Sequence, residues 1–340
     1  MKILIIQTAF LGDVILITPL IRALKKLFPQ SKIDVLVIPQ MSDILLHNPH
    51  IDEILIFDKR KSKILNFVKT LSLLRKKHYN IALLPHSSMT TSVLIFFSRI
   101  KTRVGFKRWL SSLLLTQRVP FRKKIHRIKK NLDLLSPFSE AKFDIQTELF
   151  PDANDFEKAE NLLSGLDPVK KKIAFAPGSV WHTKRWLEAY YRELAQKLVE
   201  AGFSIVLVGS PEEKELCERI KPGSDAITIA GNATVLESAA VLKNCDLLVS
   251  NDCGALHIAN AMETDVFAII GPTITQIGYF PFRKNDFVFE TVLPCRPCGS
   301  HGGQKCPKGH HLCMKNITPD SVYKKVHEHF HARNQYEEKD

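Results

Sequence analysis

Short apolar runs rich in β-branched residues alternate along the chain with amphipathic stretches, and each run ends in a turn of small or polar residues. In the second half these turns include Pro177-Gly178-Ser179, Gly209-Ser210, Asn251-Asp252 and Gly271-Pro272. The alternation predicts βα units that form a parallel sheet covered on both faces by helices. In such a sheet the turns lie along the carboxyl edge, which is where ligands bind in doubly wound folds.

The chain is long enough for two units of this kind, because 340 residues, 45% of them hydrophobic, exceed one compact core. In the first half we predict a helix from Leu16 to Leu27 and strands at Ile3 to Ile6, Ile33 to Ile38, Ile54 to Phe57 and Ile81 to Leu84. In the second half we predict a helix from Trp186 to Ala201 and strands at Ile173 to Ala176, Phe203 to Val208, Ile227 to Ile229, Asp246 to Ser250 and Val266 to Ile270. A turn-rich segment places the boundary near residue 165. The expected fold is therefore α/β, with two Rossmann-like doubly wound domains at residues 1–165 and 166–340.

Positive charge is concentrated in one stretch of the first half. Lys and Arg outnumber Asp and Glu by 48 to 35, and 20 of the cations lie from Lys59 to Leu132, where no Asp or Glu occurs. Such a stretch predicts a positive face with a polyanionic partner, the alternative being a solvated surface. The sequence has no window of 18 apolar residues, and its seven cysteines fit a reducing compartment, so we expect a cytoplasmic protein.

A carboxylate follows the first predicted strand, in the turn Gln7-Thr-Ala-Phe-Leu-Gly12-Asp13. Asp13 there either stabilises a helix N-terminus or, at the mouth of an interdomain cleft, takes a proton from an attacking hydroxyl. The sequence leaves both interpretations open. Because the turn lacks the Gly-x-Gly-x-x-Gly pattern, it disfavours a dehydrogenase.

Two turns of the second half favour an anionic ligand. The first runs from Pro177 to Trp186, and its backbone N–H groups and Lys184 suit a diphosphate at a helix start; exposed cations at that start are the alternative. In the second, Gly254 allows close backbone approach while Asp252 and His257 can face one ligand; the alternative is an Asp that only caps a helix. The chain contains no Asp-x-Asp metal-binding pair, so Lys184 and N–H dipoles would stabilise a diphosphate leaving group without a metal.

Four of the seven cysteines lie close together in a loop rich in Pro and Gly, at Cys295, Cys298, Cys306 and Cys313. The Cys-x-x-Cys spacing of the first pair is that of metal ligands. The later gaps are irregular, so the loop is either a structural zinc or iron site or a cluster of reduced thiols. A catalytic metal is disfavoured because the loop is far along the chain from Asp13.

Together these motifs resemble the bacterial lipopolysaccharide ADP-heptose heptosyltransferases, glycosyltransferase family 9, over essentially the whole chain. The segments that carry the resemblance are Gly12-Asp13 with Ile17-Thr18-Pro19-Leu20, Pro177-Gly178-Ser179 with Lys184-Arg185-Trp186, Asn251-Asp252-x-Gly254-x-x-His257 and Cys306-Pro-x-Gly-His-His-x-Cys313. The last segment is more similar to heptosyltransferase II than to heptosyltransferase I. The family has the GT-B fold, in which an N-terminal acceptor-binding domain and a C-terminal ADP-sugar-binding domain face a cleft.

The resemblance implies an inverting, metal-independent transfer of heptose from ADP-heptose to the inner-core heptose of lipopolysaccharide. It implies that Asp13 is the general base, that Lys184 holds the donor phosphates, and that Glu212 and Glu213 contact the ribose or adenine. The other implied donor-binding residues are Ser179, Asp252, Cys253, Gly254 and His257. Cys253 departs from the family, which commonly has Thr there, so we expect phosphate binding by its backbone N–H and not by a side-chain hydroxyl.

The resemblance also gives the positive stretch a partner. This is the phosphorylated lipid A-core acceptor at the cytoplasmic face of the inner membrane, contacted electrostatically and without insertion. The residues expected on this surface are Arg103, Lys107, Arg108, Arg122, Lys123 and Lys124. Three alternatives stay open: a heptosyltransferase of another acceptor, another GT-B nucleotide-sugar enzyme such as an epimerase, and a basic nucleic-acid-binding protein. The last would leave Asp13 and the Asp252 turn without a role.

Overall fold

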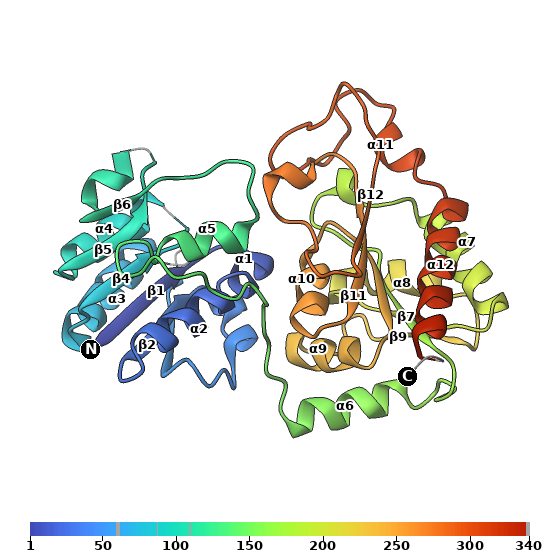
Figure 1. Ribbon diagram of the computed structural model, residues 1–340, viewed down its shortest axis with the longest axis horizontal. Helices are drawn as coiled ribbons and strands as arrows, with labels where there is room; N and C mark the ends of the chain where they lie inside the picture. The colour runs from blue at the N-terminus through green and yellow to red at the C-terminus, as the bar shows by residue number, and fades with distance from the viewer. Residues whose placement is uncertain (59–61, 87, 109, 338–340) are drawn as a thin grey trace. The chain divides into compact units, whose positions relative to one another are not determined.

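The computed structural model describes residues 1–58, 62–86, 88–108 and 110–337, and the chain divides into two compact units, Met1–Asp152 and Ala153–Asp340 (Figure 1). Each unit contains a six-stranded parallel sheet with helices on its faces. This confirms the predicted α/β class and the two doubly wound sheets.

The first sheet has the strand order β3-β2-β1-β4-β5-β6, and every neighbouring pair is parallel. Its strands are β1 (Lys2–Gln7), β2 (Lys32–Val37), β3 (Glu53–Ile56), β4 (Ile81–Leu84), β5 (Thr102–Phe106) and β6 (Gln117–Val119). The helices are α1 (Leu11–Ile15), α2 (Thr18–Leu27), α3 (Lys63–Lys77), α4 (Met89–Phe97) and α5 (Arg127–Asp133), with short 3-10 turns η1 (Pro39–Met41), η2 (Asp43–Leu45) and η3 (Leu110–Leu114). Leu4 and Ile6 of β1 pack with Leu74 of α3 and Leu94 of α4 in one core. Because Ile3 and Ile5 are also fully buried, both faces of this sheet are covered.

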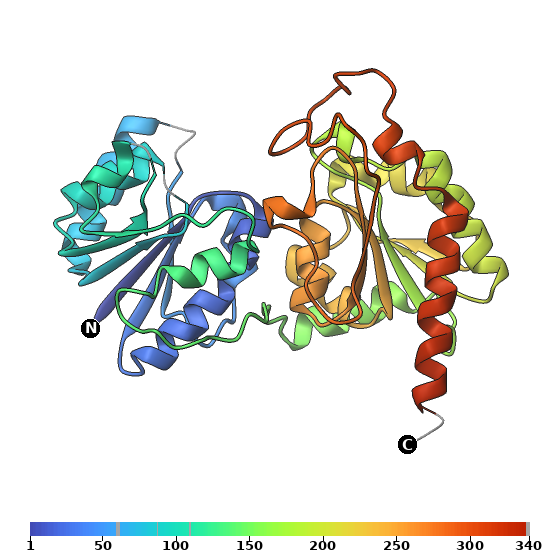
Figure 2. The ribbon, with the colours of Figure 1, turned by 45° about the horizontal axis from the view of Figure 1, so that its top comes forward.

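The second sheet has the order β12-β11-β10-β7-β8-β9, again with all neighbours parallel. Its strands are β7 (Lys172–Ala176), β8 (Ser204–Leu207), β9 (Ala226–Thr228), β10 (Leu247–Asn251), β11 (Asp265–Ile270) and β12 (Phe287–Glu290). The helices are α6 (Ala153–Leu163), α7 (Glu188–Glu200), α8 (Lys214–Ile220), α9 (Val235–Lys243), α10 (Gly254–Ala261), α11 (Leu312–Lys315) and α12 (Pro319–Glu337), with 3-10 turns η4 (His182–Lys184), η5 (Pro211–Glu213) and η6 (Thr275–Ile277). Residues of β7, α7, α8 and α12 share one core, and α12 lies beside α7 (Figure 2).

The division between the units lies between Asp152 and Ala153, whereas the sequence predicts a boundary near residue 165. The difference is α6, which packs against α9 of the second unit. The helix predicted from Leu16 to Leu27 is confirmed as α2, which begins two residues later, at Thr18, after the separate short helix α1 that ends at Ile15. Pro19, within the first turn of α2, suits a helix start and not a helix interior.

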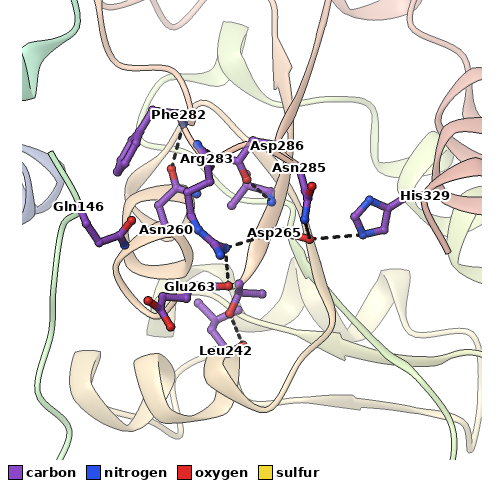
Figure 3. Close-up of polar contacts among 12 residues, drawn as sticks. Gln146, Leu242, Asn260, Glu263, Asp265, Phe282, Arg283, Asn285, Asp286 and His329 are labelled. Atoms are coloured by element: carbon purple, nitrogen blue, oxygen red, sulfur yellow. Dashed lines mark hydrogen bonds and ion pairs between the residues drawn. The ribbon is translucent and has the colours of Figure 1, made fainter. Parts of the chain in front are cut away.

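A buried carboxylate fixes the start of β11. Asp286 accepts hydrogen bonds from the backbone N–H of Val266 at 2.7 Å, from the backbone N–H of Arg283 at 2.7 Å and from the Asn260 amide at 2.9 Å (Figure 3). Burial raises the pKa of Asp286 to about 6, against the lowering effect of these donors.

No helix in the described part of the chain is both long enough and apolar enough to span a bilayer.

Candidate functional site

Asp13 lies in α1, directly after the carboxyl end of β1. Gln7, the last residue of β1, donates from its side-chain amide to the backbone carbonyl of Asp13 at 3.3 Å, and Gln7 itself is fully buried. The guanidinium Nε of Arg127 is 3.8 Å from Asp13 Oδ1, and Arg127 also donates to the Pro85 carbonyl at 2.8 Å. Arg127 therefore faces the Asp13 carboxylate, whereas Gln7 holds the Asp13 backbone. Asp13 is in the first turn of a five-residue helix, so both interpretations of it stay compatible with its position.

Lys184 and Asp252 form an ion pair on the carboxyl edge of the second sheet. Lys184 Nζ is 2.6 Å from Asp252 Oδ2, and the two side chains are only 12% and 11% exposed. Thr273, in the turn after β11, donates its hydroxyl to the same carboxylate at 2.8 Å. The turns that follow β7, β10 and β11 thus meet at the Asp252 carboxylate, as we predict for turns at the carboxyl edge of one parallel sheet.

Two local expectations for these residues are wrong. The helix predicted from Trp186 begins at Glu188, so Lys184 is the last residue of η4 and does not lie in the first turn of α7. Asp252 is not a helix cap, because the N-cap of α10 is Cys253 and no side chain forms a capping hydrogen bond there. The alternative of an exposed cation at a helix start does not hold for Lys184, because its charge is balanced by Asp252 in a nearly buried pair.

The structure adds two polar residues to this site, Asn251 and Thr273. The Asn251 side chain accepts from the backbone N–H of Trp186 at 2.9 Å and donates to the Pro177 carbonyl at 2.7 Å. It therefore joins the end of β10 to both ends of the turn that contains Lys184. Asn251 ends β10 and Thr273 lies in the turn after β11, so their position at the carboxyl edge could have marked them as site residues in the sequence. Their partners could not be predicted, because these depend on the order of the strands in the sheet.

Glu212 and Glu213 occupy different environments. The Glu213 carboxylate accepts from the backbone N–H of Ser210 at 2.9 Å, completes a capping box at η5 and lies against Gly178, where an added Cβ would be 1.9 Å from it. Glu212 is exposed, and a hydrogen bond from the Ser210 side chain lowers its pKa. Glu212 lines a recess of about 290 Å³, whose other walls are Pro177, Arg185, Trp186, Glu188, Tyr191, Glu215, Leu216 and Arg219. Of the two acids, Glu212 is the one open to a ligand.

The remaining predicted donor residues lie around the same edge. Ser179 is buried, and its hydroxyl accepts from the Trp181 backbone N–H at 3.4 Å. Burial raises the pKa of Cys253, whose thiol contacts the Ser250 hydroxyl at 3.4 Å, so the thiol is protonated at neutral pH. Gly254 begins α10, and His257 is buried on it, edge-on to Tyr279 at 6.3 Å.

The four late cysteines suit a metal site chemically. Burial would raise the pKa of Cys306, but hydrogen bonds from the backbone N–H groups of residues 308–311 outweigh it and hold that pKa below its ordinary value. Burial raises the pKa of Cys298 and of Cys313, and each is raised further by the charges of the other cysteines. Cys298 Sγ is 3.3 Å from the Cys295 carbonyl. The charges of the four cysteines act on one another, so a bound cation would favour their ionisation, but no three cysteine or histidine ligand atoms of this loop lie within 4.8 Å of one another in the described structure.

The Cys-rich loop, residues 295–313, contacts the turn that carries Lys184. Gly303 exchanges three hydrogen bonds of 2.8–3.0 Å with the backbone N–H and hydroxyl of Thr183, and His311 Nε2 is 2.9 Å from the Thr183 carbonyl. Arg296, almost fully buried, donates to the carbonyls of Ile270 and Thr273 at 3.1 and 2.7 Å. The loop therefore supports both η4 and the turn after β11.

The six predicted surface cations are not equivalent. Arg103 donates to the backbone carbonyls of Leu114 at 2.8 Å and Ile100 at 2.6 Å, and burial lowers its pKa. Arg122 binds the Asp133 carboxylate through two nitrogens, one of them at 2.8 Å. Four cations remain exposed, and none of them forms an ion pair with the part of the chain that the structure describes: Lys107, Arg108, Lys123 and Lys124. The first residues of the basic stretch, 59–61, lie outside the described ranges.

Comparison of the sequence with known proteins shows which family the chain is similar to. Residues 67–306 match the sequence profile of Glycosyltransferase family 9 (heptosyltransferase). The chain is 26% identical to lipooligosaccharide heptosyltransferase 2 of Haemophilus influenzae, with 96% of this chain and 99% of that protein covered. It is 24% identical to lipopolysaccharide heptosyltransferase 2 of Escherichia coli, over 96% of this chain and 97% of the relative.

Solved structures with the same fold include a glycosyl transferase family 9 protein from Veillonella parvula, with a TM-score of 0.86, 21% identity and 96% of each chain covered. They also include the E. coli ADP-heptose lps heptosyltransferase II, with a TM-score of 0.81, 22% identity and 98% and 100% coverage. At these identities the structures establish the two-sheet fold.

Proposed function

Because the chain belongs to glycosyltransferase family 9, the heptosyltransferases, we propose that it transfers heptose from ADP-heptose to the inner-core heptose of lipopolysaccharide. The family match and the heptosyltransferase 2 relatives support this reaction over the epimerase and nucleic-acid alternatives. The observation that carries it is the meeting of Lys184, Asp252 and Thr273 beside the start of α10. It is a charged, nearly buried site where backbone N–H groups and a lysine can receive a diphosphate.

The donor would bind through its diphosphate at this edge. Lys184 Nζ and the N–H groups at the start of α10 would face the phosphate oxygens, with Cys253 contributing its backbone N–H. Glu212, which lines the recess, would accept hydrogen bonds from the ribose hydroxyls, whereas Glu213 stabilises the conformation of η5. Asp252 would keep Lys184 in position while the phosphates share its charge.

The chemical step would be a single displacement. The Asp13 carboxylate takes the proton of an acceptor heptose hydroxyl, the hydroxyl oxygen forms a bond to the anomeric carbon, and the bond to the ADP oxygen breaks. ADP leaves with the bonding electron pair, stabilised by Lys184 and N–H dipoles, without a metal. One displacement inverts the anomeric configuration. Arg127 and Gln7 orient Asp13 for the proton transfer.

The test of this proposal is ADP release from ADP-heptose with two acceptors. With heptosyl-Kdo2-lipid A we expect steady turnover, and with Kdo2-lipid A little or none, because the first heptose provides the attacking hydroxyl. The anomeric configuration of the product is read by NMR. Turnover on Kdo2-lipid A alone would reassign the acceptor, and ADP release without any acceptor would point to another nucleotide-sugar reaction. Binding of the acceptor would take place at the cytoplasmic face of the inner membrane.

We also propose a structural zinc or iron ion held by Cys295, Cys298, Cys306 and Cys313, on the support of the Cys-x-x-Cys spacing and the lowered pKa of Cys306. Binding of the ion would draw the four sulfur atoms closer together than they lie in the structure. Such an ion would stabilise the folded loop and take no part in the displacement. Because the loop hydrogen-bonds to Thr183, which lies next to Lys184, loss of the metal ion should also weaken ADP binding. Metal analysis of the purified protein should give about one ion per chain, and Cys306→Ser should lower both the metal content and the melting temperature. A metal-free wild type that melts as high as the metal-loaded one would leave the cysteines as reduced thiols.

A further inference from the structure

Exposed hydrophobic side chains of the first unit gather on three neighbouring elements. Among the described residues, 18 large hydrophobic side chains are exposed, and nine of them belong to this group: four on α3, three on α4 and two on η3. Ile64 is 83% exposed and Leu110 is 72% exposed. A soluble chain rarely leaves such a concentration uncovered unless the surface has a partner.

Six of these side chains lie on elements that contact one another in turn, α3 with α4 and α4 with η3. Ile64, Val68 and Arg75 recur at helical spacing on one side of α3, and Arg75 Nε donates to the Phe97 carbonyl at the end of α4 at 2.9 Å. That side of α3 therefore faces α4, beside which it lies (Figure 1). Next along the surface, α4 contacts η3, where Leu110 and Leu113 are three residues apart and share a side. We call this surface, represented by Ile64, Val68, Phe96, Phe97, Leu110 and Leu113, the apolar face.

Cations border the apolar face, and one of them, Lys69, lines a small recess together with Asp58. Lys63, Lys69, Lys101 and Lys107 are exposed, and none forms an ion pair within the described ranges. Arg103 lies over the Phe96 ring, with its guanidinium carbon 5.4 Å from the ring centroid. The segment from residue 59 to residue 132 has no Asp or Glu at all. Aliphatic and aromatic side chains with a mainly cationic border are the pattern of a protein surface that enters an anionic membrane interface.

Two other partners fit this pattern less well. A second copy of the chain would have to bring two positive borders together, which repel each other. Single-stranded nucleic acid is held by aromatic rings on which bases stack, whereas Ile64, Val68, Leu110 and Leu113 are aliphatic. Charge complementarity and aliphatic exposure together favour a negatively charged bilayer.

We propose that the apolar face inserts its side chains into the headgroup region of an anionic leaflet while the bordering lysines and arginines contact lipid phosphates. This deepens the proposed function, since a lipid-linked acceptor has to be reached at a membrane surface. It also replaces the expectation of purely electrostatic contact. Electrostatic attraction is screened at high salt, whereas burial of apolar side chains is not.

The test uses the full chain and sedimentation with vesicles that contain 30% phosphatidylglycerol in phosphatidylcholine, at 0.1 M and 0.5 M salt. The variant Ile64→Ser/Val68→Ser/Leu110→Ser/Leu113→Ser removes aliphatic groups from the apolar face. The matched control, Val169→Ser/Val292→Ser, changes valines that are 89% and 97% exposed on the second unit. We expect the face variant to lose binding at least ~10-fold at both salt concentrations, and the control to bind like the wild type. Melting curves check that both variants fold.

Equal binding of the face variant and the wild type would overturn the proposal, as would wild-type binding that vanishes at 0.5 M salt. A wild-type dimer that the face variant abolishes, with no vesicle binding by either, would assign the face to a second copy. Turnover with an O-deacylated, water-soluble acceptor distinguishes a failure of membrane insertion from a failure of the proposed reaction, because this acceptor does not require a membrane. The face variant should keep that turnover, and a wild type inactive on every acceptor would refute the reaction without affecting the vesicle result.

Discussion

Replacing Lys184 with methionine separates two roles of this lysine, phosphate binding and neutralisation of Asp252. At 2.6 Å, the Coulomb attraction of the pair is about 6 kcal/mol for an effective dielectric constant of about 20. Desolvation of two nearly buried groups offsets much of this. Because Lys184→Met leaves Asp252 buried with only the Thr273 hydroxyl to stabilise its charge among the described side chains, we expect a loss of about 3 kcal/mol in the free energy of unfolding.

The double variant Lys184→Met/Asp252→Asn removes the uncompensated charge. We expect it to recover about 2 kcal/mol of that loss, which is the signature of a coupled pair. Urea unfolding followed by circular dichroism and tryptophan fluorescence measures these free energies. Lys197→Met is the matched control, because its partner Asp320 is exposed and the expected change is below about 0.5 kcal/mol.

Calorimetry with ADP gives the second measurement. If Lys184 contacts the phosphates, both Lys184→Met and the double variant should bind ADP at least ~10-fold more weakly, since removing Asp252 does not replace the cation. If the double variant binds ADP like the wild type, Lys184 acts only through Asp252 and the phosphate role is refuted. A stability loss below about 0.5 kcal/mol in Lys184→Met would refute the description of a buried ion pair.

Three further predictions follow from the geometry. Asp13→Asn should bind ADP like the wild type and lose turnover about 100-fold or more, and an active Asp13→Asn enzyme would contradict the general-base role. Arg127→Met should lower turnover about 10-fold without weaker ADP binding, because Arg127 positions Asp13, whereas Lys243→Met, which breaks the exposed pair with Glu263, should leave turnover unchanged. Since the pKa of Asp286 in the folded chain, about 6, lies above its ordinary value of 3.8, its ionisation opposes folding. The free energy of unfolding should therefore be highest below pH 4 with respect to this group and fall by up to about 3 kcal/mol as the pH rises to about 6. Urea midpoints between pH 4 and pH 7 should show this slope in the wild type and a flatter one in Asp286→Asn.

The strands in the interiors of both sheets were predictable because their residues are buried on both faces and form unbroken apolar runs. The run at Ile3 to Ile6 became β1, and that at Val266 to Ile270 became β11. The edge strands β3 and β9 were predicted as well, but β5 and β6 were not predictable in this way. The strand β5 contains Arg103 and Gly105, and β6 contains Gln117 and Arg118, so neither has a continuous apolar pattern. Pairing of β5 with β4, and of β6 with β5, supplies the stability that their composition does not.

The candidate site was predictable where a motif occupies one turn, as with Asp13 or with Asp252 and Gly254. It was not predictable where the contact joins distant turns. Whether Lys184 reaches Asp252 depends on β7 and β10 being neighbours in the sheet, and local spacing does not contain that information. The same holds for Thr273 and Arg127, which approach the site from segments whose sequences carry no motif.

The amide of Asn251 links the end of β10 to Pro177 and Trp186. Its hydrogen bonds therefore fix the segment that contains Lys184 to the segment that contains Asp252. An exchange of donor preference between related enzymes therefore has to transplant both segments together with this asparagine. A graft of either segment alone would leave one donor and one acceptor of the amide unmatched inside the protein, and the chimaera would lose stability before its sugar preference could be measured.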